Sequence, residues 1–481
     1  MMTDNDEPSE PEVVLASPTK TFFVHMLTRD IELKDAILDL LDNCIDGVLR
    51  RINAKKRKSS TPYKDYWAKI TLNPNEFIIE DNCGGIPREI AINSAFMMGR
   101  LDGERDAKLE TIGMYGIGMK RAIFKMGQNC VVNSQPVGES AFDVAITAAW
   151  MKKEGPDAWT LPITDAKKRS TDGTKIHVTR LRPEIKKQFN ANKGNFEEDL
   201  CREISNLFAV IMEKGFSIKV NGTTVKPVPL TLMIPKRIGR GDRIEPYVFT
   251  GDYKGVSIEI VAGFYRPLAT EQEIDEELTR RRKKSNAGWT VICNDRVVLS
   301  HDTSIQTGWG TTGVASYHNQ FIAIAGIATF RSNESEHLPL NTTKRGLDMN
   351  SPVYSIALDH MKRGLKKLIK YTNDWKKRID ETAAQFQELE PVKATEVSKR
   401  VSPSKFSTSR KHTAMGTGKY YEPSLPKPKV QKTTKRISYI APIKDIELLG
   451  DYFYEDKKAN HNEIGKRCFD ECVVEAKEEL E

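Results

Sequence analysis

The segment from Asp30 to Arg51 constrains the fold more than any other part of the sequence, because it has the pattern of one long helix with two unlike faces. It contains no proline and only one glycine. At about 100° per residue, seven apolar side chains fall on one face: Leu33, Ile37, Leu40, Leu41, Cys44, Ile45 and Val48. The opposite face carries Asp35, Asp39, Asp42, Asn43 and Asp46. We therefore expect one face to pack on a core and the other to hold acids.

The acidic face allows two interpretations. Asp39, Asn43 and Asp46 stand at positions i, i+4 and i+7, so they share one stripe of the helix. Such a stripe is most often a solvated surface. However, no lysine or arginine lies within it to offset the like charges. A bound metal ion would explain the stripe better, because hard cations take oxygen ligands.

Three glycine-containing motifs follow this helix. Phe77–Ile86 reads as an apolar strand that ends in Asp81 and a pair of glycines, and Asp172–Val178 reads as a turn that enters a strand. Between them, Gly113–Lys120 leads into a helical run. Glycines before a helix N-terminus let backbone N–H groups approach phosphates. Each motif alone is compatible with an ordinary turn, and Gly113–Lys120 lacks the spacing of the common phosphate-binding fingerprints.

In this order, the helix and the three motifs resemble the GHKL ATPase superfamily of DNA gyrase, MutL, the ninety-kilodalton heat-shock chaperones and histidine kinases. The resemblance covers roughly Thr21 to Val178 and implies ATP and Mg²⁺ as cofactors. It implies a general base at Asp39, a magnesium ligand at Asn43 and an adenine-binding acid at Asp81. The other nucleotide-binding positions that it implies are Asp46, Gly85, Ile86, Gly113, Tyr115, Gly116, Ile117, Gly118, Met119, Lys120 and Thr174.

Two residues depart from the family pattern. Asp39 stands where the family usually has glutamate, and Cys83 stands where it usually has its first glycine. A side chain one methylene shorter could misplace an attacking water by about 1 Å, which can cost about a hundredfold in rate. The sequence therefore supports nucleotide binding better than rapid hydrolysis.

A β-rich region follows, with hairpin signals at Asn221-Gly222 and Asn294-Asp295. A β-rich domain in this position resembles the ribosomal-S5-like transducer domain of MutL, gyrase and especially MORC-type ATPases. In that family a loop sends a lysine to the γ-phosphate. Leu338–Arg345 fits this loop, so Lys344 is a second catalytic candidate, with a surface lysine as the alternative interpretation.

The fold class predicted is α+β, a GHKL (Bergerat) α/β sandwich followed by a transducer. We expect four regions: the ATP-binding domain at 1–182, the transducer at 183–384, a disordered basic linker at 385–436 and a short helical region at 437–481. Twelve lysines and arginines but only two acids lie between residues 391 and 440, although the whole chain has a net charge of +8. This composition favours a flexible arm that binds DNA. A second basic cluster, expected to contact DNA from the transducer, comprises Arg280, Arg281, Arg282, Lys283 and Lys284.

Several classes of protein are disfavoured. No apolar run approaches the roughly 18 residues of a membrane helix, and the first residues are acidic and polar, unlike a signal peptide. Seven scattered cysteines form neither a disulfide framework nor a zinc motif. We therefore expect a cytoplasmic protein that does not contact membranes.

The expected function is that of a MORC-like or MutL-like ATPase. Such a protein would form a homodimer on binding ATP and Mg²⁺ and act as a DNA-associated clamp, in bacterial genome maintenance or anti-phage defence. The alternative is a slow or inactive ATP-gated scaffold that recruits a protein effector through its C-terminal region. A heat-shock chaperone is disfavoured because no long middle domain is visible.

Overall fold

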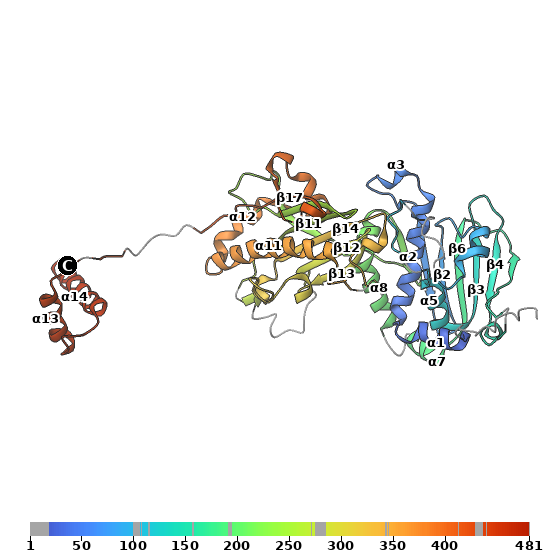
Figure 1. Ribbon diagram of the computed structural model, residues 1–481, viewed down its shortest axis with the longest axis horizontal. Coiled ribbons are helices and arrows are strands. Elements are labelled where there is room, and N and C mark those ends of the chain that lie inside the picture. The colour runs from blue at the N-terminus through green and yellow to red at the C-terminus, as the bar shows by residue number, and fades with distance from the viewer. Residues whose placement is uncertain are drawn as a thin grey trace, which may run out of the picture. The chain divides into compact units, whose positions relative to one another are not determined.

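The computed structural model describes residues 19–480, apart from 100–105, 107, 114–115, 156–157, 191–194, 271, 275–284, 342–343, 345, 412, 429–435 and 439. The chain forms two compact units, which divide between Pro428 and Lys429. The first unit contains two large sheets, and the described part of the second contains two helices (Figure 1).

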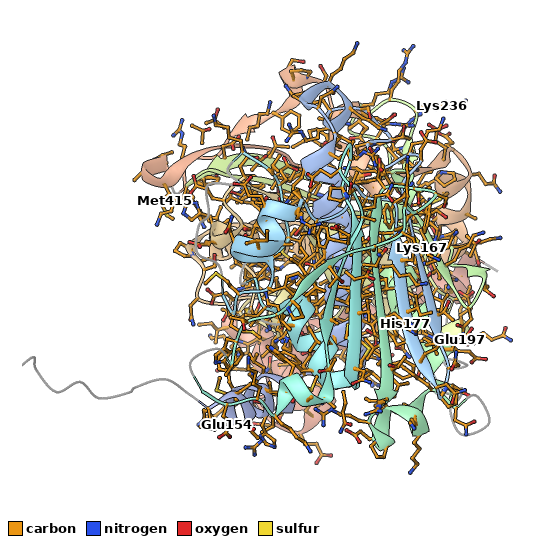
Figure 2. The ribbon with its side chains drawn as sticks, turned by 90° about the vertical axis from the view of Figure 1, so that its right-hand side faces the viewer. Glu154, Lys167, His177, Glu197, Lys236 and Met415 are labelled. Atoms are coloured by element: carbon orange, nitrogen blue, oxygen red, sulfur yellow. The ribbon has the colours of Figure 1, made fainter. Side chains whose placement is uncertain are left out.

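The first sheet has eight strands in the described part of the chain, in the order β5-β4-β3-β6-β2-β1-β7-β8. Their bounds are β1 Trp67–Leu72, β2 Glu76–Asp81, β3 Gly127–Gln135, β4 Phe142–Ile146, β5 Ile163–Asp165, β6 Gly173–Leu181, β7 Ser217–Val220 and β8 Thr223–Thr224. One face is covered by helices that share a single apolar core with it: α1 (Lys20–Arg29), α2 (Leu33–Arg51), α5 (Gly118–Met126) and α8 (Phe196–Leu207). The other face carries polar side chains such as His177 (Figure 2). The Nε2 of His177 lies 2.8 Å from Glu76 Oε2.

Helix α2 confirms the predicted amphipathic pattern on its apolar side. All seven apolar residues of that face are buried. The predicted boundary at 182–183 differs from the observed sheet, because β7 pairs in parallel with β1 and brings buried Ile218 and Val220 into the first core. Parallel pairing needs a crossover connection, and the helices α7 (Pro183–Gln188), α8 and α9 (Ala209–Glu213) supply it.

The second sheet has seven strands in the described residues, in the order β13-β12-β14-β11-β10-β17-β16. Their bounds are β10 Tyr247–Tyr253, β11 Val256–Phe264, β12 Gly288–Cys293, β13 Arg296–Asp302, β14 Ile324–Arg331, β16 Ser407–Thr408 and β17 Gly416–Tyr421. The long helix α11 (Pro352–Trp375) packs on one face. A two-stranded ribbon of β9 (Thr231–Pro235) and β15 (Leu389–Lys393) contributes to the core of the other. Both hairpin signals are confirmed, since Asn221-Gly222 and Asn294-Asp295 have positive φ angles.

The segment predicted as a disordered linker, 385–436, is ordered over most of its described length. Strand β17 pairs with β10, and β15 pairs with β9. A few apolar side chains in this polar segment, among them Val392, Val397 and Tyr421, are buried against the second sheet. The buried Tyr421 hydroxyl also donates to Glu245. The polar composition of the segment gave no indication that these few side chains are buried, and their burial accounts for the order of the segment.

The second unit contains α13 (Ile443–Tyr454) and α14 (His461–Leu480). They pack on each other around Gly450, where an added Cβ would lie 2.7 Å from the Asp456 carbonyl oxygen. Both helices lie within residues 437–481, where a short helical region was expected. Across the residues that the structure describes, no helix is both long and apolar enough to span a membrane.

Candidate nucleotide site

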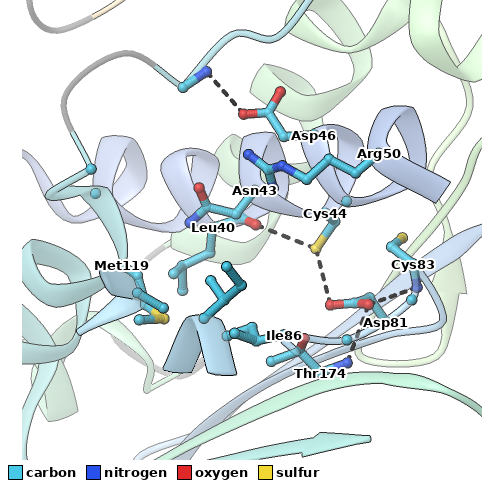
Figure 3. Close-up of a pocket in the computed structure, with 18 of the residues that line it drawn as sticks. Leu40, Asn43, Cys44, Asp46, Arg50, Asp81, Cys83, Ile86, Met119 and Thr174 are labelled. Atoms are coloured by element: carbon cyan, nitrogen blue, oxygen red, sulfur yellow. Dashed lines mark hydrogen bonds between the residues drawn. The ribbon is translucent and has the colours of Figure 1, made fainter. Parts of the chain in front are cut away.

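A pocket of about 1120 Å³ opens where α2, the end of β2 and the loop before α5 meet. This volume is slightly above the range of roughly 300–1,000 Å³ that is usual for small-molecule sites. Lys344 also lines the pocket, although it belongs to the chain that follows β14 of the second sheet. Figure 3 shows the part of the pocket around Asn43 and Asp81. The predicted catalytic residue Asp39 lines it, and so do nearly all predicted nucleotide-binding residues: Asn43, Asp46, Asp81, Gly85, Ile86, Gly113, Gly116, Ile117, Gly118, Met119, Lys120 and Thr174.

Asp81 ends β2 with a buried carboxylate. Its Oδ1 accepts from the backbone N–H groups of Cys83 (2.8 Å) and Thr174 (3.3 Å), and its Oδ2 lies 3.5 Å from the Cys44 thiol (Figure 3). Burial raises the pKa of the Asp81 carboxyl above its ordinary range. Thr174 therefore supports Asp81 through its backbone rather than its hydroxyl.

Two glycines allow the close backbone approaches around Asp81. An added Cβ on Gly173 would lie 2.0 Å from the Asp81 carbonyl oxygen, and one on Gly85 would lie 2.5 Å from the Gln135 carbonyl oxygen. Gly85 also has a φ of +71°, which disfavours other residues. Cys83, which departs from the family pattern, is accommodated by Gly47 of α2: an added Cβ there would lie 3.3 Å from the Cβ of Cys83.

The acids of α2 do not form a solvated face. Asn43 is exposed at the pocket wall, but Asp39, Asp42 and Asp46 are all buried. The charges of Asp39 and Asp42 are offset by residues from distant parts of the chain, which the sequence pattern of the helix alone could not reveal. Asp39 pairs with Arg121 of α5 at 2.7 Å.

Lys344 joins the second sheet's domain to these acids. Its Nζ lies 3.3 Å from Asp39 Oδ1 and 3.1 Å from Asp42 Oδ2. Burial alone would lower the pKa of Lys344, but the Asp42 and Asp39 carboxylates hold it above its ordinary value. The residue has a φ of +57°, which is uncommon for lysine and occurs preferentially at functional sites. The interpretation of Lys344 as a surface lysine is therefore wrong.

The glycine loop is anchored at both ends. Asp46 accepts from the backbone N–H groups of Ile112 and Gly113, each at 2.9 Å. At the other end, Gly118 begins α5 directly beside Asp39, and the Lys120 ammonium donates to the carbonyl oxygens of Ala95 and Gly116. Burial lowers the pKa of Lys120 to about 8. Tyr115 lies outside the described residues.

The tip of the β12–β13 hairpin is a further part of this region that the sequence did not identify. Asn294 donates to the Thr111 carbonyl oxygen at 3.0 Å, just before the glycine loop. Asp295 accepts from both Lys214 (2.7 and 2.8 Å) and Tyr63 (3.1 Å) of the first domain. The Asn-Asp turn signalled a hairpin, but nothing in the sequence indicated that its tip is buried.

The pocket fits a magnesium ion that arrives with a phosphate-bearing ligand. Mg²⁺ usually takes one or two protein oxygens and completes its shell with waters and phosphates. Asn43 offers an exposed amide oxygen at the pocket wall. No group of three or more His, Cys, Asp or Glu within the described ranges is placed to hold a metal by itself. The predicted DNA-contacting cluster Arg280–Lys284 lies outside the described residues.

Residues 31–176 match the family model described as "Histidine kinase-, DNA gyrase B-, and HSP90-like ATPase". The matched segment contains every pocket element except Lys344. The match supports the expected GHKL superfamily and the α/β fold of the ATP-binding domain. No curated protein matches the chain.

Proposed function

We propose that this protein binds ATP with Mg²⁺ and hydrolyses it slowly. The observation that carries the proposal is the convergence in one pocket of a strand-end carboxylate, an exposed asparagine and a glycine loop at a helix N-terminus. Asp81 would accept from the adenine amino group, and Asn43 would hold the ion. Backbone N–H groups at the start of α5 would face the phosphates.

Asp39 and Lys344 are the proposed catalytic pair. Asp39 would orient and deprotonate the attacking water, and Lys344 would contact the terminal phosphate. When bound, Mg²⁺ would neutralise part of the phosphate charge. Lys344 suits this role because it lines the pocket. The two carboxylates beside its ammonium keep the lysine protonated, as a phosphate contact requires.

A slow or inactive ATP-gated scaffold is the second candidate, and one observation favours it. Both oxygens of Asp39 are engaged, Oδ1 with Lys344 and Oδ2 with Arg121. A water bound to either oxygen would compete with a cationic partner until that partner moves. The exposed apolar side chains of the C-terminal helices, such as Leu448 and Tyr452, offer a surface for a protein effector.

We further propose the MORC-like or MutL-like arrangement, in which ATP closes a homodimer on DNA. Exposed Phe22 and Met26 on α1 support an apolar contact between copies. Exposed basic side chains along residues 393–427 support binding to phosphate backbones; they are Lys393, Lys399, Arg400, Lys405, Arg410, Lys411, Lys419 and Lys427.

The test is to measure ATP binding by calorimetry and ATP turnover with and without duplex DNA. An ATPase of this type should bind ATP in a magnesium-dependent manner and release phosphate above background. Binding without any turnover would favour the scaffold. No binding at all would contradict both candidates.

A further inference from the structure

Lys344 has two carboxylate partners that differ in their access to the pocket. Asp39 lines the pocket, whereas Asp42 does not and is only 1% exposed. The Lys344 ammonium contacts both. A ligand in the pocket can therefore compete with Asp39 for the ammonium, but it cannot reach past the lysine to displace Asp42.

Asp42 is in turn held by Arg296, at the start of β13. Arg296 Nε donates to Asp42 Oδ1 at 2.8 Å, and both side chains are almost completely buried. The Nη1 of Arg296 donates to the carbonyl oxygens of Leu207 (3.2 Å) and Val297 (2.8 Å). Its guanidinium also lies 4.2 Å from the ring centre of Phe208. Because backbone and ring contacts fix the arginine, the position of the Asp42 carboxylate is fixed as well.

The result is a row of alternating charges that starts in the second sheet and ends on α5. Arg296, Asp42, Lys344 and Asp39 follow one another at 2.8, 3.1 and 3.3 Å, and Arg121 closes the row 2.7 Å from Asp39. A buried ammonium that lost its only partner would carry a large desolvation cost. Lys344 avoids this cost, because it keeps Asp42 if it leaves Asp39.

We propose that Asp42, fixed by Arg296, is the positioning residue for Lys344, and that it lets the ammonium turn from Asp39 to the terminal phosphate of the nucleotide. The same movement would release Asp39 Oδ1 for a water molecule. This inference rests on the proposed function, since it takes the pocket's ligand to be ATP. A purely structural role for Asp42 and Arg296, as a tie between the two domains, is the competing explanation.

The closing experiment measures selectivity for the terminal phosphate, which needs no turnover. Calorimetry gives the affinities for ADP and for a non-hydrolysable ATP analogue in wild type, Lys344→Met, Asp42→Asn and the double variant. Lys344→Met should reduce the preference for the analogue by about tenfold, the usual scale of a charge-assisted hydrogen bond. Asp42→Asn should reduce it similarly, and the double variant should lose no more than Lys344→Met alone.

Asp295→Asn is the matched control. Asp295 is also a buried carboxylate that ties the β12–β13 hairpin to the first domain, but it pairs with Lys214 and Arg331 rather than with Lys344. It should leave the selectivity unchanged. In turnover, Asp42→Asn should raise KM for ATP by about as much as it weakens binding of the analogue, because the contact is already made in the ground state, and it should also lower kcat, because Asp39 Oδ1 is released less often.

If the losses in the double variant add, Asp42 does not act through Lys344 and the inference is wrong. If Asp42→Asn does not fold, Arg296→Lys is used instead; its smaller loss of selectivity should likewise vanish in the Lys344→Met background, and persistence there overturns the inference. A wild type that binds no nucleotide overturns the proposed function itself, and the inference with it.

Discussion

Cys44 and Asp81 face each other across the pocket end of β2, with 3.5 Å between the thiol sulfur and Asp81 Oδ2. The other oxygen, Oδ1, is already occupied by the backbone N–H groups of Cys83 and Thr174. A thiol is a weak donor, so Oδ2 is the oxygen that a stronger donor in the pocket can use. The adenine amino group is such a donor.

This division of roles makes Asp81→Asn an informative variant. The amide oxygen can take the place of Oδ1, so the backbone contacts should persist. The amide nitrogen would replace Oδ2 and present a donor to the adenine amino group. An unpaired buried polar group costs about 1–3 kcal/mol, so calorimetry should show ATP affinity reduced by more than about tenfold.

Glu80→Gln is the control for this measurement. Glu80 precedes Asp81 on β2, but it pairs with Arg169 and does not line the pocket. Its replacement should leave ATP affinity within about twofold. Equal affinities for wild type and Asp81→Asn would exclude Asp81 as the adenine-binding acid.

Asp39→Asn should separate binding from chemistry. The amide cannot accept the proton of water, and general-base catalysis is typically worth about 10²–10⁴ in rate. Phosphate release should therefore fall to background, while ATP affinity stays within about threefold. A variant that retains turnover would show that Asp39 is not the base.

Asp39→Glu tests whether side-chain length limits the rate. The longer carboxylate could reach beyond Arg121 and Lys344 and place the water better, so turnover should rise above wild type. Arg121→Lys serves as a comparison that keeps the charge beside Asp39 but changes its geometry. Slower turnover in Asp39→Glu would mean that the local packing is built for the shorter acid.

The lowered pKa of Lys120 leads us to expect that nucleotide affinity depends on pH. Burial lowers its pKa to about 8, so the free protein loses this charge as the pH rises through that value. Phosphates favour the protonated form. Affinity should therefore be constant at lower pH and decline above about pH 8, by up to about tenfold per pH unit.

Lys120→Met should bind ATP more weakly and abolish this decline. Lys125→Met is the matched control, since Lys125 lies on the same helix but donates to the Thr28 carbonyl oxygen, away from the pocket. An unchanged decline in Lys120→Met would assign the titration to another group.

The sequence predicted the parts of the site that depend on local patterns. The two faces of α2, the strand that ends in Asp81 and the glycines before α5 are each visible within about a dozen residues, and all of them meet in the pocket. The place of Lys344 in the site could be predicted only from the resemblance to a family. Its contact with Asp39 joins residues 305 positions apart.

The predictions that differ from the structure depended on tertiary context. The acidic stripe could be interpreted as a solvated surface because the arginines that pair with its acids, Arg121 and Arg296, come from other elements. The strand β7 belongs to the first sheet because of its pairing with β1, which no local pattern encodes. The basic segment has a disordered composition, yet a few buried residues such as Val397 order it.

This ordering changes how DNA binding should be tested, because removing the basic segment would remove strands of the second sheet. Neutralisation to glutamine at Lys399, Lys405, Arg410 and Lys419, all exposed, keeps the strands. If each contacts one phosphate, the slope of log affinity against log salt should fall by about three to four in filter binding. The control neutralises the exposed Lys167, Lys168, Lys186 and Lys187 of the first domain. If the slope falls equally in both variants, the effect depends on net charge alone rather than on the basic segment. If it falls in neither, a protein partner is favoured over DNA.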